Sequence, residues 1–186
     1  MPQTALLVID LQRGAFDGER CPPIERGNEL LAHASALIEA ARAAPIPVIY
    51  VQHCGLAGDA LEEGSPHGEF HEAIAPLPAD KIVKKHRSNA FDDTELTGTL
   101  ENLGVECLIF CGLQSEHCVF NTAEAALANG YSVVVAADGH GTWPSSEETA
   151  DAIAVRINEQ LRGKGASAQL TADLVRSLDP TDQSLR

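Results

Sequence analysis

Short apolar runs separated by helical patterns restrict the possible folds of this chain more than any other feature. The runs are rich in Val, Ile and Leu, and apolar and polar residues do not alternate cleanly within them. This pattern is typical of parallel strands covered on both faces, because such strands have no solvent side. Five strands are therefore predicted, over residues 5–9, 48–51, 82–84, 107–111 and 132–136.

Amphipathic patterns with helical spacing fill the segments between these strands. They cover residues 30–41, 96–103, 119–127 and 153–161. Ser145 or Ser146, followed by acidic residues, is expected to cap the last of these helices, and a weaker sixth strand is expected over 168–170. The alternation predicts an α/β fold with three layers: a doubly wound, mostly parallel six-stranded sheet with helices on both faces.

Length and charge limit the classes of protein to consider. A chain of 186 residues fits one domain, so a single domain over 1–186 is predicted. A formal net charge of −14 argues against nucleic acid and anionic membranes as partners. No apolar run is long enough to span a membrane, and the N-terminus lacks the basic region of a signal peptide. Five cysteines without the spacing of a disulfide framework indicate reduced thiols and a cytoplasmic protein.

Residues 55–78 break the alternation. The segment is rich in Gly, Pro, His and Glu, and its length is typical of a lid or a binding loop. His67 and His71 are four residues apart, and with His53 they are candidates for a metal site. A proline and a glycine beside the pair disfavour the helix that it needs, so we expect loop histidines without a metal.

Cys118 occupies the position in this chain best suited to thiol chemistry. Segment 112–119 follows an apolar strand and precedes a helical pattern, so the thiol is expected at a strand–turn–helix junction. The positive end of the helix is expected to lower the pKa of the thiol and to favour a nucleophilic thiolate. Two other cysteines fit the apolar strand before it and one lies in a loop, which leaves Cys54 as the rival nucleophile.

Two kinds of charged residue accompany Cys118 at the carboxyl ends of predicted strands. Asp10 closes the first strand, and Lys84 or Lys85 closes the third. Ligands bind outside the carboxyl ends of the strands in an open parallel sheet, so these side chains are expected to meet at one edge. A carboxylate that takes the thiol proton and a cation that holds the thiolate form a coherent set for acyl transfer.

Four segments, in this order and spacing, resemble the isochorismatase-like cysteine hydrolases, a family that includes nicotinamidases and related amidases. They are residues 7–12, 85–91, 112–119 and 138–143, and together they span nearly the whole chain. The register of Ala90 and Phe91 in the second segment places the lysine of the family at Lys85 rather than Lys84.

The resemblance implies a catalytic triad of Asp10, Lys85 and Cys118 that acts on a small molecule without a cofactor. It also implies an oxyanion hole formed by the backbone N–H groups of Gln114 and Cys118. A cis peptide between Leu113 and Gln114 would turn these groups inward. Members of the family commonly self-associate, so a homo-oligomer is expected.

Departures from the family pattern narrow the implied activity. Many members carry Tyr-Ser-Ala-Phe at 88–91, where this chain reads Ser-Asn-Ala-Phe, so the pocket wall differs. The nicotinamidase metal motif is not matched at 51–55. True isochorismatases cleave a vinyl ether without a cysteine at this position, so Cys118 argues against that activity. Segments 114–118 and 139–143 look closer to the branch of streptothricin-hydrolase-like amidases.

Several residues in or near these segments are candidates for binding substrate: Gln12, Phe16, Phe91, His117 and Trp143. The three aromatic residues fit a pocket wall, and packing in the core explains them nearly as well. His117 adjoins the nucleophile. Neighbours at a tight turn usually point apart, which favours a pocket-lining role for His117 over a cysteine–histidine dyad.

The sequence therefore predicts a cofactor-free amidase that cleaves the C–N bond of a small-molecule amide through a thioester. Two alternatives stay open. One is a metal-assisted, nicotinamidase-type hydrolase that uses His53, His67 or His71, and the other is a catalytically silent binding protein on the same fold. Dinucleotide binding is disfavoured, because residues 10–14 lack the glycine spacing that a pyrophosphate needs.

Overall fold

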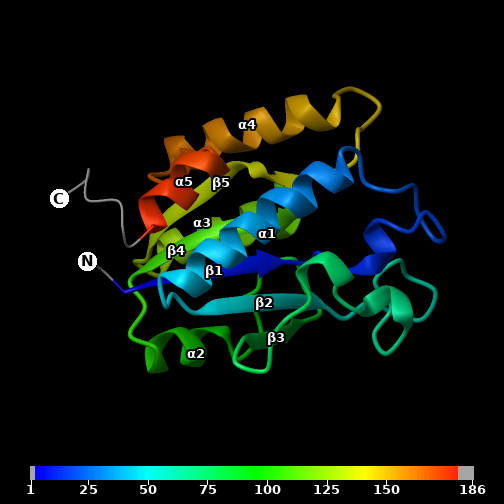
Figure 1. Cartoon of the computed structure of the whole chain (residues 1–186). Coiled ribbons are helices and arrows are strands. Elements are labelled where there is room, and N and C mark those ends of the chain that lie inside the picture. The colour runs from blue at the N-terminus through cyan, green and yellow to red at the C-terminus, as the bar shows by residue number, and fades with distance from the viewer. Residues whose placement is uncertain (1–2, 180–186) are drawn as a thin grey trace.

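The computed structural model describes residues 3–179, so the predicted domain over 1–186 extends outside the described part at both ends. Six strands form one sheet in the order β3-β2-β1-β4-β5-β6, and every neighbouring pair is parallel (Figure 1). The predicted doubly wound sheet is thereby confirmed. The strands are β1 (Thr4–Ile9), β2 (Val48–His53), β3 (Lys81–Lys85), β4 (Cys107–Leu113), β5 (Ser132–Gly141) and β6 (Ser167–Gln169).

Helices cover both faces of this sheet, as predicted. Two of them pack on the face that lies in front in Figure 1, and three pack on the opposite face. The first group comprises α1 (Gly27–Ala43) and α5 (Thr171–Leu178), and the second comprises α2 (Leu96–Asn102), α3 (Phe120–Ala128) and α4 (Ala150–Gly163). Helix α5 was not among the predicted elements. It has only eight residues, too few for its apolar spacing to stand out.

The position of β1 near the centre of the sheet explains why its sequence does not alternate between apolar and polar residues. Ala5, Leu7 and Ile9 pack toward α2, α3 and α4, whereas Leu6 and Val8 pack toward α1 and α5. All five side chains are fully buried. Successive residues of a strand point to opposite faces, so a strand covered on both sides reads as a continuous apolar run.

The start of α4 differs from the prediction. Thr149 caps this helix, because its side chain accepts the backbone N–H of Ala152 at 3.2 Å. Ser145, one of the two predicted caps, instead accepts the N–H groups of the second and third residues after it. The serine closes a turn that precedes the helix, and the true cap follows four residues later.

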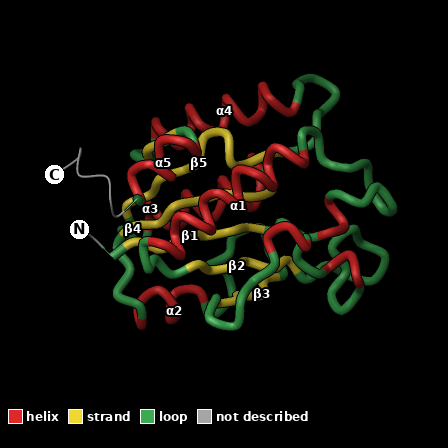
Figure 2. Tube along the Cα trace, viewed as in Figure 1, coloured by secondary structure: helices red, strands yellow, loops and turns green. Residues whose placement is uncertain are grey.

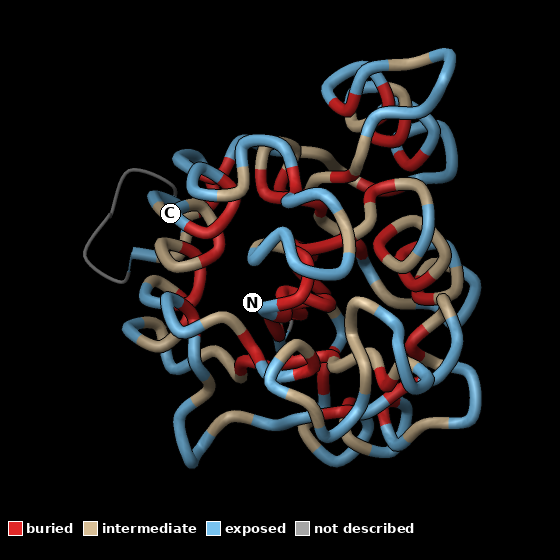
Figure 3. The backbone as a smooth tube through the Cα atoms, turned by 90° about the vertical axis from the view of Figure 1, so that its right-hand side faces the viewer, coloured by how far each residue is buried: buried red, intermediate tan, exposed pale blue. Residues whose placement is uncertain are grey.

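The carboxyl ends of the strands face one edge of the molecule, where the long loops gather (Figure 2). After β1 comes the short helix η1 (Arg13–Ala15). The connection from β2 to β3 contains η2 (Pro66–Gly68) and η3 (Glu72–Ile74). Figure 3 looks onto this edge and shows buried segments toward the middle with exposed loops around them. No helix within residues 3–179 has the length and apolar character needed to cross a bilayer.

β4 approaches β1 so closely at Gly112 that only glycine fits. Gly112 pairs with Ile9, and a Cβ atom at this position would lie 2.0 Å from the Ile9 carbonyl oxygen. Its φ of +130° lies in a region that L residues rarely adopt. This contact brings the segment that leads to Cys118 directly beside the residue that follows Ile9, which is Asp10.

Candidate active site

The structure brings Asp10, Lys85 and Cys118 together at the carboxyl edge of the sheet. Asp10 follows β1, Lys85 is the last residue of β3, and Cys118 lies in η4 (Ser115–Val119), a π-helical turn between β4 and α3. Lys85 Nζ donates to Asp10 Oδ2 at 2.7 Å and to Cys118 Sγ at 3.1 Å. The ammonium group of Lys85 thus joins Asp10 and Cys118, which are far apart in the sequence.

Lys85 rather than Lys84 is the lysine of this cluster, as its register predicted. The Lys85 side chain is 0% exposed, whereas Lys84 pairs with Glu63 on the surface. Besides Asp10 and Cys118, Lys85 Nζ lies 3.4 Å from His53 Nδ1, so each of its three protons has an acceptor. Burial alone would lower the pKa of Lys85, but the charges of Asp10 and Cys118 outweigh it and raise this pKa.

Asp10 has one carboxylate oxygen available for chemistry. Its side chain is buried, and Oδ2 accepts from Lys85. Within residues 3–179 the other oxygen, Oδ1, is buried without a hydrogen-bond partner. The backbone of Asp10 has a φ of +53°, a conformation that Asp tolerates better than most residues. A buried carboxylate oxygen without a donor is a ready acceptor for a proton.

The thiol of Cys118 differs from the prediction in its pKa. Burial and the negative charge of Asp10 raise the pKa of Cys118 to about 11, although Lys85 acts in the opposite direction. The expected effect of a helix N-terminus does not prevail, because Cys118 is the fourth residue of the π turn and not the residue ahead of it. The thiol is therefore protonated at neutral pH and requires a base to become a nucleophile.

Ser88 is a further polar contact of the thiol that sequence reasoning missed. Its hydroxyl donates to Cys118 Sγ at 3.8 Å, and Asn121 Nδ2 donates to Ser88 Oγ at 2.8 Å. Asn121 lies in the first turn of α3, so the helix that follows the cysteine also orients the serine. The departure from the family pattern at 88–91 was the only signal that pointed to this position.

A cavity of about 600 Å³ opens beside this cluster. Residues of η1, β2, β4, η4 and several connecting segments line it. They are Asp10, Ala15, Cys21, Pro22, His53, Asp59, Ala60, Leu61, Ser88, Leu113, Gln114, His117, Cys118 and Trp143. Residues 59–61 belong to the segment that was predicted to be a lid or binding loop, and they supply part of the wall. Cys21, which the sequence placed in a loop without a role, also faces the cavity.

Two of the predicted substrate-binding residues line the cavity, namely His117 and Trp143. The Trp143 ring is fixed at its edge, because its indole N–H donates to the Pro22 carbonyl at 2.6 Å. Phe16 and Phe91 are not among the described lining residues, and a substrate-binding role for them stays a prediction. Phe91 packs against the core and stacks on another ring, and the ring of Phe16 meets an imidazole edge on.

Gln12 also lies outside the described lining, and its contacts give it a different place in the site. Its amide nitrogen donates to the carbonyl oxygens of His53 and Gly68 at 2.9 and 2.8 Å. Its amide oxygen accepts the His53 N–H at 2.8 Å. The side chain is fully buried. Gln12 therefore joins the end of β1 to the end of β2 and to the loop beyond it.

The three histidines that were candidates for a metal site do not form one cluster among the described residues. His53 lines the cavity, and burial and the charge of Lys85 lower its pKa. His67 Nδ1 lies 2.7 Å from a carboxylate oxygen of Asp17. His71 packs edge on against Phe16 and accepts a backbone N–H. Each of the three histidines therefore has different partners, and a shared ion on all of them was the alternative that the sequence left open.

The backbone around Cys118 has the cis peptide that the family resemblance implies. The peptide between Leu113 and Gln114 is cis. Gln114 and Cys118 both line the cavity, and the carbonyl of Gln114 accepts the N–H groups of His117 and Val119 at 3.2 and 3.1 Å. The second of these bonds spans five residues and defines the π turn, a feature that often occurs at functional sites.

A buried network beneath η4 holds the turn against β5. His140 Nδ1 lies 2.8 Å from Ser115 Oγ, and its Nε2 lies 3.1 Å from Asn158 Oδ1. Asn158 in turn donates to the Ala137 carbonyl at 2.9 Å. Burial lowers the pKa of His140, so the ring is neutral. The sequence placed residues 138–143 at the end of the fifth strand, and β5 continues to Gly141. The hydrogen-bond network of His140 was not predicted.

Fold and site together define an α/β protein whose half-buried thiol meets a carboxylate and an ammonium at the edge of a parallel sheet. Residues 4–164 match the family model described as the isochorismatase domain, and the chain belongs to this family. It is 33% identical over 162 residues to a streptothricin hydrolase of Streptomyces noursei, an alignment that covers 86% of this chain and 63% of that protein. The chain thus spans less than two thirds of the length of this relative.

Two solved structures show how far the fold is shared. A putative isochorismatase from Burkholderia xenovorans LB400 has a TM-score of 0.86 and 29% identity, with coverage of 95% of this chain and 88% of that chain. A cysteine hydrolase from Pseudomonas syringae pv. phaseolicola 1448A has a TM-score of 0.90 and 22% identity, with coverage of 95% and 92%. The second likeness concerns the fold alone.

Proposed function

We propose that this protein is a cysteine-dependent amidase, which hydrolyses the C–N bond of a small-molecule amide through a thioester on Cys118. The observation that carries the proposal is the contact of Lys85 with both Asp10 and Cys118 beside an open cavity. These three groups supply a base, a cation and a nucleophile at one point, which is the set that acyl transfer requires.

The first step is activation of the thiol. With a pKa of about 11, the Cys118 thiol keeps its proton until a base removes it. Oδ1 of Asp10 is the free acceptor in the site, and Lys85 lies against both groups and stabilises the thiolate. Transfer of the proton from sulfur to Asp10 is therefore coupled to the attack on the substrate carbonyl.

The following steps use the same carboxyl group again, as an acid and as a base. The thiolate attacks the amide carbon, and the N–H groups of Gln114 and Cys118 stabilise the oxyanion of the tetrahedral intermediate. Asp10 returns its proton to the amide nitrogen, the C–N bond breaks, and the amine or ammonia leaves a thioester. Asp10 then takes a proton from water, which attacks the thioester. The C–S bond breaks, Asp10 gives this proton to the departing sulfur, and the carboxylic acid leaves the free thiol behind.

The cavity supports a small-molecule substrate. A volume of about 600 Å³ lies within the range of sites for ligands of this size. Its wall combines the aromatic ring of Trp143 with the polar groups of His53 and His117. Relatives named streptothricin hydrolase and ureidoacrylate amidohydrolase support hydrolysis of an amide bond. A homo-oligomeric state and a cytoplasmic location stay predictions from the sequence.

The test is turnover of a panel of small amides and lactams, read by release of ammonia or amine. We expect Cys118→Ala to abolish turnover and to leave the melting temperature nearly unchanged, while Cys107→Ala on the distant end of β4 keeps activity. A mass increase on Cys118 equal to the acyl group would identify the thioester. Activity retained by Cys118→Ala would rule the mechanism out.

The same panel separates the two alternative functions. Turnover that disappears with a chelator and returns with a metal ion, and that survives in Cys118→Ala, would indicate a metal-assisted hydrolase. Tight binding of an amide without any turnover by the wild-type protein would indicate a binding protein.

A further inference from the structure

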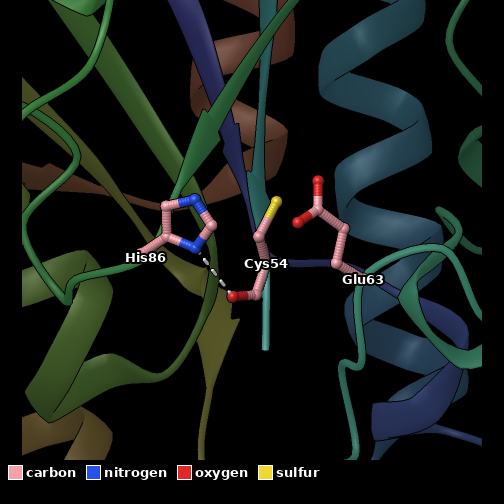
Figure 4. Close-up of side chains that lie close together, drawn as sticks. All are labelled: Cys54, Glu63 and His86. Carbon is pink, nitrogen blue, oxygen red and sulfur yellow. Dashed lines mark hydrogen bonds between the residues drawn. The ribbon is translucent and has the colours of Figure 1, made fainter. Parts of the chain in front are cut away.

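A second cluster of chemically capable side chains lies outside the cavity. Cys54 follows β2, Glu63 ends the turn that comes after it, and His86 follows β3 (Figure 4). The Cys54 sulfur, a Glu63 carboxylate oxygen and a ring nitrogen of His86 lie within 4.8 Å of one another. The described lining of the cavity includes none of the three. We propose that they form a binding site for a thiophilic divalent cation of the zinc type.

His86 is oriented as a metal ligand would be. Its Nδ1 lies 3.1 Å from the carbonyl oxygen of Cys54 (Figure 4). A carbonyl oxygen has no proton to give, so Nδ1 carries the hydrogen and Nε2 keeps a free lone pair. Histidine ligands of metal ions commonly donate the other ring N–H to a backbone carbonyl, which fixes the tautomer and the ring. This requirement is already met before any ion binds.

The donor set selects the kind of ion. Thiolate and imidazole ligands favour zinc and related transition metals over Mg²⁺ or Ca²⁺, and a carboxylate is a common third ligand. Ligands about 2.0–2.3 Å from one tetrahedral ion lie roughly 3.3–3.8 Å apart. The three donor atoms must therefore draw slightly closer, chiefly by rotation of the exposed Glu63 side chain. Three protein ligands leave a fourth position for water.

The Cys54 thiol and its neighbours fit this assignment better than a nucleophilic role. Cys54 is 4% exposed, and burial and the Glu63 carboxylate raise the pKa of its thiol, so it lacks the access that a reactive cysteine needs. Glu63 already pairs with a cation, because Lys84 Nζ lies 2.9 Å from its Oε1. Both side chains of this pair are exposed, and such pairs contribute little, so a divalent ion can take the place of the ammonium.

An ion at this position would connect three segments that surround the active site. The N–H of Cys54 donates to the carbonyl of Lys85 at 2.8 Å. Gly55 and Glu62 form a backbone bridge at the base of the turn whose residues 59–61 line the cavity. The bound ion would therefore fix the ends of β2 and β3 and this wall of the cavity. Its role would be structural, separate from the chemistry at Cys118.

Cobalt(II) titration of the chelator-treated full-length protein tests the site, because cobalt bound to a thiolate gives a charge-transfer absorption. We expect one equivalent to saturate this absorption in the wild-type protein and in Cys118→Ala, and zinc to displace the cobalt. Cys54→Ala should lose the absorption, and His86→Gln should bind at least tenfold more weakly. His33→Gln is the matched control, since His33 Nδ1 also donates to a backbone carbonyl, that of Asp138.

Two results would overturn the proposal. One is the absence of the absorption in the wild-type protein at millimolar cobalt, and the other is an unchanged absorption in Cys54→Ala. Melting temperatures of the metal-free variants show whether each one folds. A rise of the melting temperature with zinc in the wild-type protein, absent in folded Cys54→Ala, is the expected independent readout.

Discussion

Lys85 Nζ lies 2.7 Å from Asp10 Oδ2 in a site where Lys85 is 0% and Asp10 3% exposed. Two opposite charges without access to water depend on each other, because either one alone would be buried without compensation. The pair joins β3, at one edge of the sheet, to β1 near its centre. The Asp10–Lys85 contact, which we propose for catalysis, therefore also holds two strands of the sheet together.

Replacing Lys85 by Met is expected to damage both activity and stability. The variant leaves the Asp10 carboxylate buried without its cation, which should cost about 3–5 kcal/mol of unfolding free energy. Turnover should fall by roughly a hundredfold or more, since a base and a thiolate both lose their partner. Urea denaturation and amide hydrolysis measure the two effects. Lys84→Met, on the surface beside it, should change stability by less than about 0.5 kcal/mol, and equal losses in both variants would contradict this assignment.

Asp10→Asn should accelerate alkylation of Cys118 while abolishing hydrolysis. The Asp10 charge helps to raise the pKa of Cys118 to about 11, so its removal lowers this pKa and increases the thiolate fraction at a given pH. In the wild-type protein the rate of alkylation should rise with pH up to about 11. In the variant the rise should come at lower pH, with a rate at pH 8 higher by about tenfold for each unit of lowered pKa. Peptide mass spectrometry measures the modification of Cys118, and a variant that reacts no faster than wild type would show that Asp10 does not act on the thiol.

The sequence allowed us to predict which side chains lie together at the carboxyl ends of the strands. Apolar periodicity located the strands, and the sheet itself then brought Asp10, Lys85 and Cys118 to one edge. This inference succeeds because parallel strands end on the same side whatever their loops do. It left Lys84 and Lys85 open, and the register of Ala90 and Phe91 in the segment that resembles the family was needed to select Lys85.

The remaining features depend on contacts that no local pattern encodes. Ser88 contacts Cys118 while it accepts a hydrogen bond from Asn121 of α3, and the pKa of Cys118 depends on how deeply its sulfur is buried. Trp143 and Phe91 have similar apolar character, yet one lines the cavity and the other stacks on Tyr131. Whether an aromatic side chain lines the cavity or packs in the core depends on how the loops and helices pack in the folded chain.

Gln12→Glu is expected to loosen the loops around the cavity. The substitution keeps the shape of the side chain but replaces two amide protons, which now bind the carbonyls of His53 and Gly68, by a carboxylate oxygen. Buried acceptors would then face each other, and we expect a loss of about 3 kcal/mol or more in unfolding free energy. Gln160→Glu on the exposed side of α4 is the control and should change stability by less than about 0.5 kcal/mol. A Gln12→Glu protein as stable as the control would refute the role of this side chain in joining β1 to β2.

Acidification is expected to destabilise the protein through His140. The folded state lowers the pKa of this histidine below its ordinary value of 6.5, so the unfolded chain binds more protons as the pH falls below about 6.5. Stability is therefore complete above this pH and decreases below it, by up to about 1.4 kcal/mol per pH unit for one proton. Urea denaturation between pH 7 and 5 measures the slope. His140→Asn should be less stable at pH 7 but show a shallower slope, and identical slopes would mean that His140 is not the group that titrates.

A pair of glycine substitutions tests the close approach of β4 and β1 that places Cys118 beside Asp10. Gly112→Ala puts a Cβ atom 2.0 Å from the Ile9 carbonyl oxygen, which is rigid backbone in the centre of the sheet. We expect a loss of roughly 4 kcal/mol or more, together with loss of turnover, because both strands must shift. Gly98→Ala within α2 meets no atom within 4 Å and should stabilise the protein by about 0.4–1 kcal/mol. Denaturant unfolding measures the stability of both variants. If Gly112→Ala were as stable as the wild-type protein, β4 and β1 would not lie as close together at Gly112 as the structure shows.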